Sequence, residues 1–420
     1  MNPTDVLIVG GGVWGLSLAW HLVLAHGLSV RVVERRTSPA METSAQAAGQ
    51  IGQVRESTIA RIAALYALEF ASSVARRQLP AAFVRSGSVT VLGTPEAAEA
   101  AHTRFAAASA AGLCVDELSA SEAAALVPGL TGPIARAYHV PSDGYVEPGM
   151  FTRALADDAH DAGVDVVCDV VVTGFDIDAG RVRAARTSQG RLSADHIVVA
   201  AGPWTASLLP AVALAAWAIV LRQGRTAPAG VAREHPVVRF PEAAAYLRPE
   251  GGGYLIGAFR ATPELTPAAV LPAISRTEDI AQGPTAIDDV RDRLTAWLPA
   301  LTAERVAHHR QGWITMTPDG LPVVGRHADA ENLWFATGCG AMGFVWAPAI
   351  GRWLAQSIAE GTLIPALAPL SPARFGPLAQ DVDRLRAACR QRHANYYGLA
   401  DPGMARPSSA PSHGEHHTWK

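Results

Sequence analysis

The chain begins with a short apolar run that stops at three glycines. Residues 5–9, DVLIV, precede residues 10–12, GGG. An unbroken apolar run is typical of a strand buried on both faces of a parallel sheet. Residues 13–22, VWGLSLAWHL, then place apolar side chains at helical spacing, and residues 29–33, SVRVV, form a second short run. The pattern predicts a strand, a glycine turn, a helix and a second parallel strand.

The spacing of the glycines indicates a dinucleotide site. Gly10, Gly12 and Gly15 fit G-x-G-x-x-G, in which the first allows a tight turn, the second a close approach of pyrophosphate, and the third close packing of helix on strand. The free N–H groups of the helix start favour phosphate. Glu34 lies 19 residues after Gly15, where its carboxylate can accept both ribose hydroxyls. An acid at this position argues against a ligand with a 2′-phosphate.

Two later stretches suggest a ligand longer than a nucleotide. Residues 195–204, DHIVVAAGPW, read as a strand that returns to the nucleotide. Residues 333–343, LWFATGCGAMG, end a strand in a second glycine turn, and the helical pattern of residues 344–360 follows. Phosphate at the first turn and a ring system at the second would use both helix starts, and the second helix dipole would stabilise negative charge on a reduced flavin.

These stretches together resemble the FAD-dependent D-amino acid oxidase superfamily, and most closely its glycine oxidase, sarcosine oxidase and dimethylglycine dehydrogenase branch. The resemblance rests on VGGGVWGLS, VVAAGPWT, TPDGLPVVG and LWFATGCGAMGFVWAPAIG, and it covers about residues 5–375 in matching order. It implies an α/β fold in which a Rossmann-type FAD-binding domain is interleaved with an antiparallel-sheet α+β substrate domain. It also implies oxidation of the C–N bond of an amine, amino acid or N-methyl amino acid.

The resemblance gives expected domain boundaries. The FAD-binding domain would comprise residues 1–85, 143–210 and 316–370, and the substrate domain residues 86–142 and 211–315. Ala-rich residues 94–127 read as helices, and residues 237–259 read as strands around a turn at residues 251–253. Residues 371–420 would form a C-terminal helix and a mobile tail, similar to the segment that precedes a folate-binding domain in dimethylglycine dehydrogenase-like proteins, with no folate domain in this chain.

The small, uncharged residues 43–52, TSAQAAGQIG, are expected to pass the diphosphate and the flavin ring. Dimethylglycine dehydrogenase-like enzymes have a His-Ala-Ala-Gly run here, whose histidine tethers the flavin, but this chain has Gln46. Gly312 stands where sarcosine oxidase-like enzymes have the tethering cysteine, so we expect non-covalent FAD. The expected cofactor contacts are Gly10, Gly12, Val13, Trp14, Gly15, Glu34, Arg35, Arg36, Thr43, Ser44, Ala45, Gln46, Ala48, Gly49, Gln50, Ile51, Val171, Ala201, Gly202, Trp204, Gly338, Gly340, Ala341, Met342 and Gly343.

The substrate residues of the family carry over only in part. Of two arginines spaced three residues apart in sarcosine oxidase-like enzymes, one falls on Gly52 and the other on Arg55. Other polar family positions fall on Met342, Val345 and Ile314. Trp313, Ile314, Met342, Phe344 and Trp346 would then form an apolar, aromatic pocket for a bulky or apolar amine, although core packing explains Trp313 and Trp346 equally well.

A carboxylate on the substrate would need a cationic partner. The candidates are Arg55, Arg222, Arg248 and Arg260, each of which also fits a structural role. Strand alternation places Tyr246 on the same face as Arg248. The expected catalytic set is Arg55, Tyr246, Arg248, Trp313, Met342 and Trp346.

Composition narrows these readings. A chain of 420 residues suggests two domains, and a net charge of -3 gives no basic field for nucleic acid. The only lysine is Lys420, which excludes chemistry by an internal lysine. Four scattered cysteines suggest neither a metal site nor a secreted framework. We expect no signal peptide, a cytoplasmic location, and no membrane span, because the longest apolar run, residues 208–221, is too short.

Three classes of function remain open at this stage. The first is a flavin amine oxidase or dehydrogenase that passes electrons to oxygen or another acceptor. The second is a flavin enzyme that oxidises a 2-hydroxy acid or an alcohol. The third is a non-catalytic FAD-binding subunit.

Overall fold

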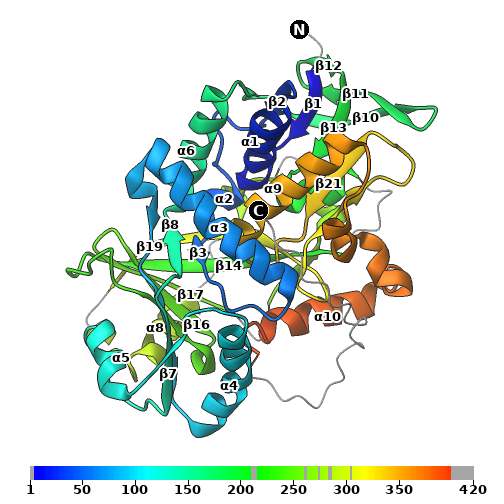
Figure 1. The fold of residues 1–420 in the computed structure, drawn as a ribbon. Coiled ribbons are helices and arrows are strands. Elements are labelled where there is room, and N and C mark those ends of the chain that lie inside the picture. The colour runs from blue at the N-terminus through cyan, green and yellow to red at the C-terminus, as the bar shows by residue number, and fades with distance from the viewer. Residues whose placement is uncertain are drawn as a thin grey trace.

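The computed structural model describes residues 4–398 except 210–214, 260–262, 273–274, 282–285 and 303–304. A six-stranded sheet forms one half of the molecule, in the order β20-β21-β13-β1-β2-β9 (Figure 1). All its pairings are parallel except that of β20 with β21. Its strands are β1 (Thr4–Val9), β2 (Val30–Val33), β9 (Asp165–Val167), β13 (Ala194–Val199), β20 (Val323–Arg326) and β21 (Leu333–Thr337). The predicted strand–turn–helix–strand unit is confirmed as β1, α1 (Val13–His26) and β2.

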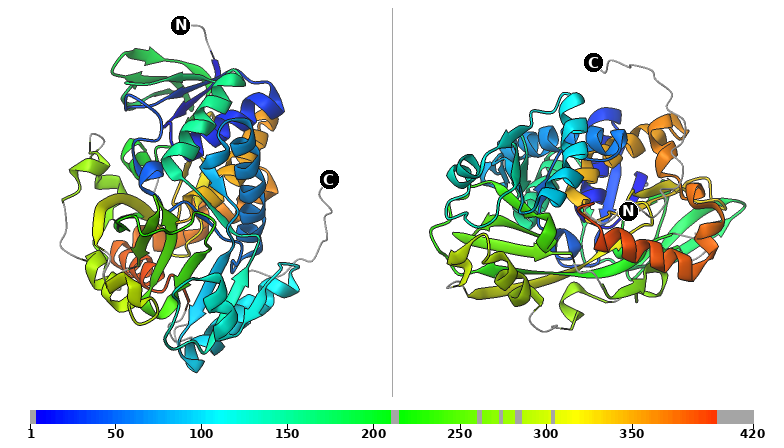
Figure 2. Two further views of the ribbon diagram at one scale, coloured as in Figure 1. Left: turned by 90° about the vertical axis from the view of Figure 1, so that its left-hand side faces the viewer. Right: turned by 90° about the horizontal axis from the view of Figure 1, so that it is seen from below.

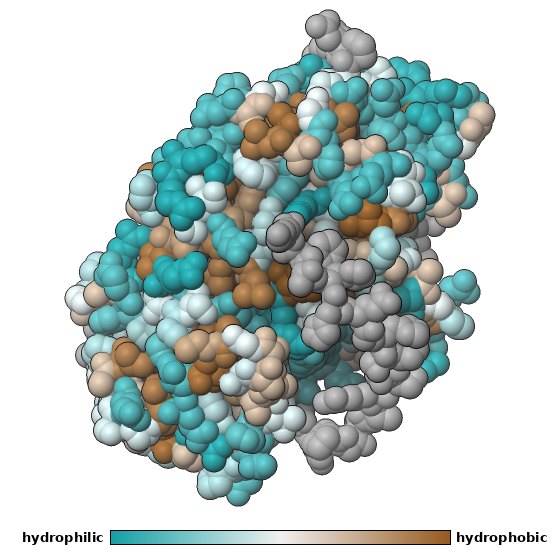
Figure 3. Space-filling view, viewed as in Figure 1, coloured by the Kyte–Doolittle hydropathy of each residue, from teal (hydrophilic) through white to brown (hydrophobic). Residues whose placement is uncertain are grey.

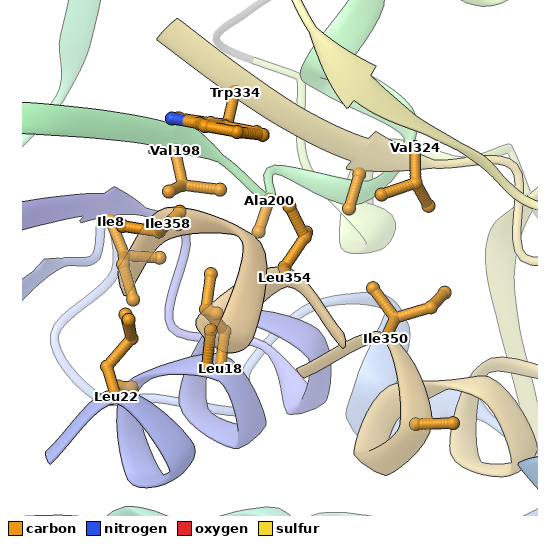
Figure 4. Packing of buried hydrophobic residues seen from close by; sticks show 14 of the residues in the cluster. Ile8, Leu18, Leu22, Val198, Ala200, Val324, Trp334, Ile350, Leu354 and Ile358 are labelled. Carbon is orange, nitrogen blue, oxygen red and sulfur yellow. The ribbon is translucent and has the colours of Figure 1, made fainter. Parts of the chain in front are cut away.

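Alternating side chains of this sheet enter two different cores. Ile8 and Val198 face α1 and α9 (Gly343–Glu360), where Leu18, Leu22 and Leu354 pack against them (Figure 4). The two helices approach closely, since a Cβ at Gly351 would lie 2.7 Å from Ser17 Oγ. The helices α3 (Thr58–Arg77) and α6 (Pro148–Asp161) complete this layer. The two helices that start at glycine turns are thus packed side by side on one face of the sheet.

The other face of the sheet is covered by strands. Leu7, Val9 and Val199 pack against residues of β11 (Arg181–Thr187) and β14 (Trp217–Thr226). β11 pairs with β10 (Val172–Asp178) and β12 (Gly190–Leu192) in a three-stranded sheet. A smaller sheet joins β3 (Gln50–Ile51), β8 (Gly144–Val146) and β4 (Phe83–Val84).

A nine-stranded sheet forms the second half of the molecule (Figure 2). Its order is β18-β14-β17-β16-β15-β5-β7-β6, with β19 also paired to β14, and its pairings are antiparallel except that of β15 with β5. The strands are β5 (Ser88–Leu92), β6 (Asp116–Leu118), β7 (Arg136–Val140), β14, β15 (Val237–Phe240), β16 (Ala245–Glu250), β17 (Gly253–Ala258), β18 (Leu265–Pro267) and β19 (Val306–Met316). The fold class is therefore as expected, with a parallel Rossmann-type sheet beside a largely antiparallel one.

The predicted helices and hairpin of this half are confirmed. The Ala-rich stretch forms α4 (Pro95–Ala110) and α5 (Ala120–Leu126). The strands β16 and β17 form the expected hairpin, with Gly251 and Gly252 in left-handed conformations at its turn. A further helix, α8 (Ala286–Leu294), contributes Ile287 and Val290 to the core of this half.

The described C-terminal segment crosses between the two halves. The helix α10 (Val382–Ala394) follows 3₁₀ turns over Pro365–Leu370 and Pro372–Gln380. Leu385 and Cys389 of α10 are buried in the core beneath the six-stranded sheet. Beyond the helix, the ring of Tyr396 stacks on Phe259 with 3.7 Å between centroids. The last described residues therefore lie at the end of β17, inside the nine-stranded half.

One described helix, α3, is long and apolar enough to span a membrane by length and composition. Half of its apolar window is buried, and Ala63, Ala67 and Phe70 pack into the protein core, as in a core helix of a globular protein. On the face shown in Figure 3, apolar residues form separate patches among hydrophilic ones.

Candidate active site

A large cavity connects the ends of the parallel strands with the nine-stranded sheet. Its volume is about 410 Å³, within the roughly 300–1,000 Å³ of small-molecule and cofactor sites. Its wall includes the first glycine turn, most of residues 43–52, the second glycine turn, and side chains from β15, β16 and β19. Ligands of open parallel sheets bind at the carboxyl ends of the strands, which is where this cavity lies.

The first glycine turn is shaped for a phosphate-bearing ligand. Gly10 has φ +117°, and a Cβ there would lie 2.6 Å from the Ala200 carbonyl oxygen. A Cβ at Gly15 would lie 2.0 Å from the Gly10 oxygen, so Gly15 seats the helix on the strand rather than lining the cavity. The N-cap residue Gly12 supplies no side-chain cap, and the first turn of α1 contains no acid. Apart from the Val13 N–H, which Ser44 accepts, the N–H groups of this turn are thus available to a ligand, with the positive end of the helix dipole behind them.

Glu34 is buried at the edge of this turn. Its Oε2 accepts from the Gly11 N–H at 2.8 Å, and its Oε1 accepts from the Arg36 N–H at 2.9 Å. Burial raises the pKa of Glu34, while the two backbone hydrogen bonds and Arg35 act in the opposite direction. The carboxylate lies in the cavity wall, as a ribose acceptor requires.

The two arginines after Glu34 take different positions. The Arg35 guanidinium lies 4.0 Å above the ring of Trp204 and pairs with Glu42 at 2.7 Å, and all three residues line the cavity. Arg36 pairs with Glu42 and with Glu278 and does not line the cavity. The expected cofactor contact of Arg36 is therefore corrected to a structural ion-pair role.

The stretch predicted to face the flavin does so with only part of its residues. It forms a short helix, α2 (Thr43–Gln46), followed by β3. The expected residues that line the cavity are Thr43, Ser44, Ala48, Gly49 and Gln50, and Ala47 joins them. Ser44 Oγ accepts from the Val13 N–H at 3.1 Å, which joins the stretch to the start of α1. The side chains that do not line it are Ala45, Gln46 and Ile51.

Gln46 faces β19 instead of the cavity. A Cβ at Gly312 would lie 3.0 Å from the Gln46 Cβ. The two positions at which the family resemblance implied a flavin tether are therefore neighbours, and here they hold an amide and no side chain.

The second glycine turn is fixed by Thr315 of β19. Its hydroxyl accepts from the N–H groups of Gly338 at 3.2 Å and Cys339 at 3.1 Å. Gly340 and Ala341 have φ of +55° and +62°, an arrangement that is strained for the alanine. The indole of Trp14 donates to the Gly343 oxygen at 2.8 Å. This bond joins the starts of α1 and α9, so one extended ligand can reach both helix ends.

The remaining expected cofactor residues also border the cavity. They are Val171, Ala201, Gly202, Trp204, Gly338, Gly340, Ala341, Met342 and Gly343.

Two residues expected at the substrate are buried elsewhere. Trp346 is 0% exposed and lies in the core between α9 and the sheet, because the third residue after Gly343 turns away from the cavity. Arg248 is also 0% exposed and pairs with Glu147 and Glu250, while its Nε donates to the Ala48 oxygen. Both expected substrate roles are corrected to structural ones.

The other arginine candidates are divided in the same way. Arg55 lines the cavity. Arg222 donates to the Ala281 oxygen and does not line it, and Arg260 is outside the described residues.

The expected apolar pocket exists on one side only. Trp313, Ile314, Met342 and Phe344 line the cavity, and the rings of Trp313 and Trp204 meet edge to face with 5.7 Å between their centroids. The opposite side holds arginine and tyrosine side chains that sequence reasoning did not select. They are Arg104, Arg239, Arg392, Tyr396 and Tyr397, beside the expected Arg55 and Tyr246.

Strand register explains how Arg239 reaches the cavity. Arg239 of β15 is opposite Thr90 of β5 on one side and Tyr246 of β16 on the other, and all three line the cavity. A Cβ at Gly52 would lie 2.8 Å from Arg239 Nη2. The guanidinium that position 52 lacks is therefore supplied from a distant strand, a substitution that no local motif reveals.

Burial shifts the pKa values of the arginines and tyrosines at this end of the cavity. Desolvation lowers the pKa of Arg55 and of Arg104. It raises the pKa of Tyr246 and of Tyr397 well above their usual range. The phenols therefore stay protonated at neutral pH, and the net field of this end is positive.

The protein is a flavoprotein oxidoreductase by family. The family described as DAO, FAD dependent oxidoreductase, matches residues 5–357, so the chain belongs to it. The glycine cradle, the acid at the ribose position and the joined helix starts described above fit that cofactor.

Among curated relatives, the chain is similar to 4-methylaminobutanoate oxidase (formaldehyde-forming) of Paenarthrobacter nicotinovorans, with 28% identity over 96% of this chain and 49% of that protein. Mitochondrial dimethylglycine dehydrogenase of Mus musculus is 30% identical over 56% of this chain and 28% of its own length. The chain thus spans about half, or less, of these relatives.

Among solved structures, glycine oxidase from Geobacillus kaustophilus shares the fold. The TM-score is 0.76 at 24% identity, over 89% of this chain and 99% of that one. The resemblance to the glycine oxidase and dimethylglycine dehydrogenase branch is confirmed by these comparisons.

Proposed function

We propose that the protein oxidises the C–N bond of an amine, an amino acid or an N-methyl amino acid, with FAD held non-covalently. The observation that carries this proposal is the continuous cavity from the Glu34 edge, past both helix starts, to a pocket between Trp313 and Arg55. Relatives named as a methylaminobutanoate oxidase and a dimethylglycine dehydrogenase support amine chemistry. Oxygen or another acceptor would take up the electrons.

The chain's own residues divide the work of holding the cofactor. The α1 start and Glu34 would hold the diphosphate and the ribose, and the turn at residues 338–343 would face the ring system. Bound flavin supplies a two-electron acceptor for the hydride of the substrate carbon. Without a linking side chain at Gln46 or Gly312, binding depends on these contacts alone.

The substrate pocket is built for positioning and for exclusion of water. Trp313, Ile314 and Met342 form an apolar wall that shields the reacting carbon. No histidine is present in the described part of the cavity wall, and the protonated phenols of Tyr246 and Tyr397 are poor bases. The positive field of the arginines favours the neutral amine over the ammonium ion. We therefore expect the substrate to react as the free amine.

The test is anaerobic reduction of the purified holoprotein. Amines, amino acids and N-methyl amino acids are mixed with the protein without oxygen, and flavin absorbance near its visible maximum is followed. Bleaching by an amine supports the proposal, and a peroxide assay in air then separates an oxidase from a dehydrogenase. Bleaching by 2-hydroxy acids or alcohols alone would replace the proposal with the corresponding oxidation. Chemically reducible flavin that no substrate class bleaches would indicate a non-catalytic subunit.

A further inference from the structure

Three arginines from distant parts of the chain converge on the pocket opposite the apolar wall. Arg55 follows β3, Arg104 belongs to α4, and Arg239 belongs to β15. All three line the cavity. They are close enough together that the charge of Arg239 acts to lower the pKa of Arg55, and the charges of Arg239 and Arg55 act to lower that of Arg104. A convergence of three like charges is costly unless an anion compensates them.

The protein supplies only a small part of that compensation. Asp143 lies 3.6 Å from Arg239, and its two oxygens also accept from the Gln53 N–H and from the Ser88 hydroxyl. Among the described residues, neither Arg55 nor Arg104 is in an ion pair. Three guanidinium groups thus face one buried carboxylate, which leaves two positive charges.

Other charges at this end do not change the count. Arg392, which also lines the cavity, pairs with Glu56 at 3.3 Å. The charge of Glu56 also attracts that of Arg104. Arg392 offsets Glu56, so the surplus at this end stays at two positive charges.

Unused hydrogen-bond donors accompany the surplus charge. The Nε atoms of Arg55 and Arg104 are buried and have no hydrogen-bond partner. Arg104 is held in place because its Nη1 donates to the backbone carbonyl oxygen of Tyr397 at 2.7 Å. Donors that are fixed and buried in this way match the planar acceptors of a carboxylate or a phosphate.

The C-terminal segment forms one wall of this anion site. Tyr396 and Tyr397 line the cavity beside Phe259, whose ring stacks on Tyr396. These rings exclude water from the guanidinium groups, which strengthens their attraction for an anion.

We propose that the substrate is an amine with two acidic groups, which Arg55, Arg104 and Arg239 bind while the amine carbon faces the apolar wall. The inference rests on the proposed function, since it assumes that the ligand of this pocket is the amine to be oxidised. It goes further by giving the charge of the substrate.

The test compares three amines that differ by one carboxylate each. N-methylglutamate carries two, 4-methylaminobutanoate one, and N-methylpropylamine none. In anaerobic stopped-flow reduction of the holoprotein, we expect the ratio of the flavin reduction rate constant to the substrate Kd to fall at least tenfold with each carboxylate removed. A dianion that is no better than the monoanion would overturn the inference, even if both bleach the flavin.

Variants locate the effect. Arg239→Met and Arg104→Met should each lower the preference for the dianion over the monoanion to within about threefold, because each removes a charge-assisted contact. Arg191→Met is the matched control, since Arg191 is an exposed residue of β12 outside the cavity. An unchanged preference in both cavity variants, with normal FAD content and melting temperature, would also overturn the inference.

A binding measurement separates failure of this inference from failure of the proposed function. Glutarate and butanoate cannot be oxidised at a C–N bond, and calorimetry measures their binding directly. If no amine bleaches the flavin but glutarate binds at least tenfold more tightly than butanoate, and Arg239→Met removes the difference, the dianion site stands and amine oxidation fails. If the two acids bind equally, the dianion site is refuted whatever the amines do.

Discussion

Replacing Glu34 with glutamine tests the nucleotide site most directly. The substitution keeps the shape of the side chain but replaces one acceptor oxygen with an NH₂ group. The two carboxylate oxygens accept backbone N–H groups at 2.8 Å and 2.9 Å. Glutamine can keep only one of these bonds. At the other, its NH₂ group would face a backbone N–H, so two donors would meet with no acceptor between them. A ribose hydroxyl could still accept from the NH₂ group, but its charge-assisted bond to the carboxylate would be lost.

The magnitude follows from the charge-assisted bond that is lost. A hydrogen bond to a charged group contributes about 1.5–3 kcal/mol. Because 1.4 kcal/mol corresponds to a factor of ten, FAD should bind roughly 10- to 150-fold more weakly in Glu34→Gln. The stability of the apoprotein should change less, since removing a buried charge also removes the desolvation that raises the pKa of Glu34.

The assay is titration of apoprotein with FAD, followed by quenching of flavin fluorescence. Glu331→Gln is the matched control. This substitution makes the same change of charge at a surface ion pair with Arg181, where the Glu331 side chain is 60% exposed. A change in FAD Kd of less than threefold in Glu34→Gln, with the control unchanged, would refute the assignment of Glu34 to the ribose.

Three further predictions concern the fold and the cofactor. Burial lowers the pKa of His21 to about 4, against about 6.5 in the unfolded chain. The contribution of His21 to the free energy of unfolding is therefore fully present above pH 6.5 and falls by up to about 3 kcal/mol as the pH drops toward 4. Urea unfolding of His21→Gln should show a weaker pH dependence. Acid precipitation should leave all FAD in the supernatant, and a yellow pellet would contradict non-covalent binding. Trp346→Phe should lower stability by about 1–3 kcal/mol through the cavity it leaves without changing substrate preference, and an altered preference would return Trp346 to the pocket.

The nucleotide half of this protein could be read from its sequence because its signals are local. The turn at Gly10, the helix at Gly15 and the acid at Glu34 all lie within one strand–helix–strand unit, in which chain connectivity fixes their relative positions. The second glycine turn could also be predicted from the sequence. The structure adds that Trp14 joins it to the first turn.

The residues at the substrate end of the cavity could not be predicted from local sequence signals. Whether Arg248 or Arg239 faces the cavity depends on which strands pair and on which face of the sheet the pocket opens, and both are decided by contacts across more than a hundred residues. Arg248 forms ion pairs with Glu147 and Glu250, whereas Arg239 enters the space left by Gly52. Sequence by itself determined the cofactor and the fold class. Tertiary packing decided which charges meet the substrate, because electrostatic partners are set by distance in space and not by separation along the chain.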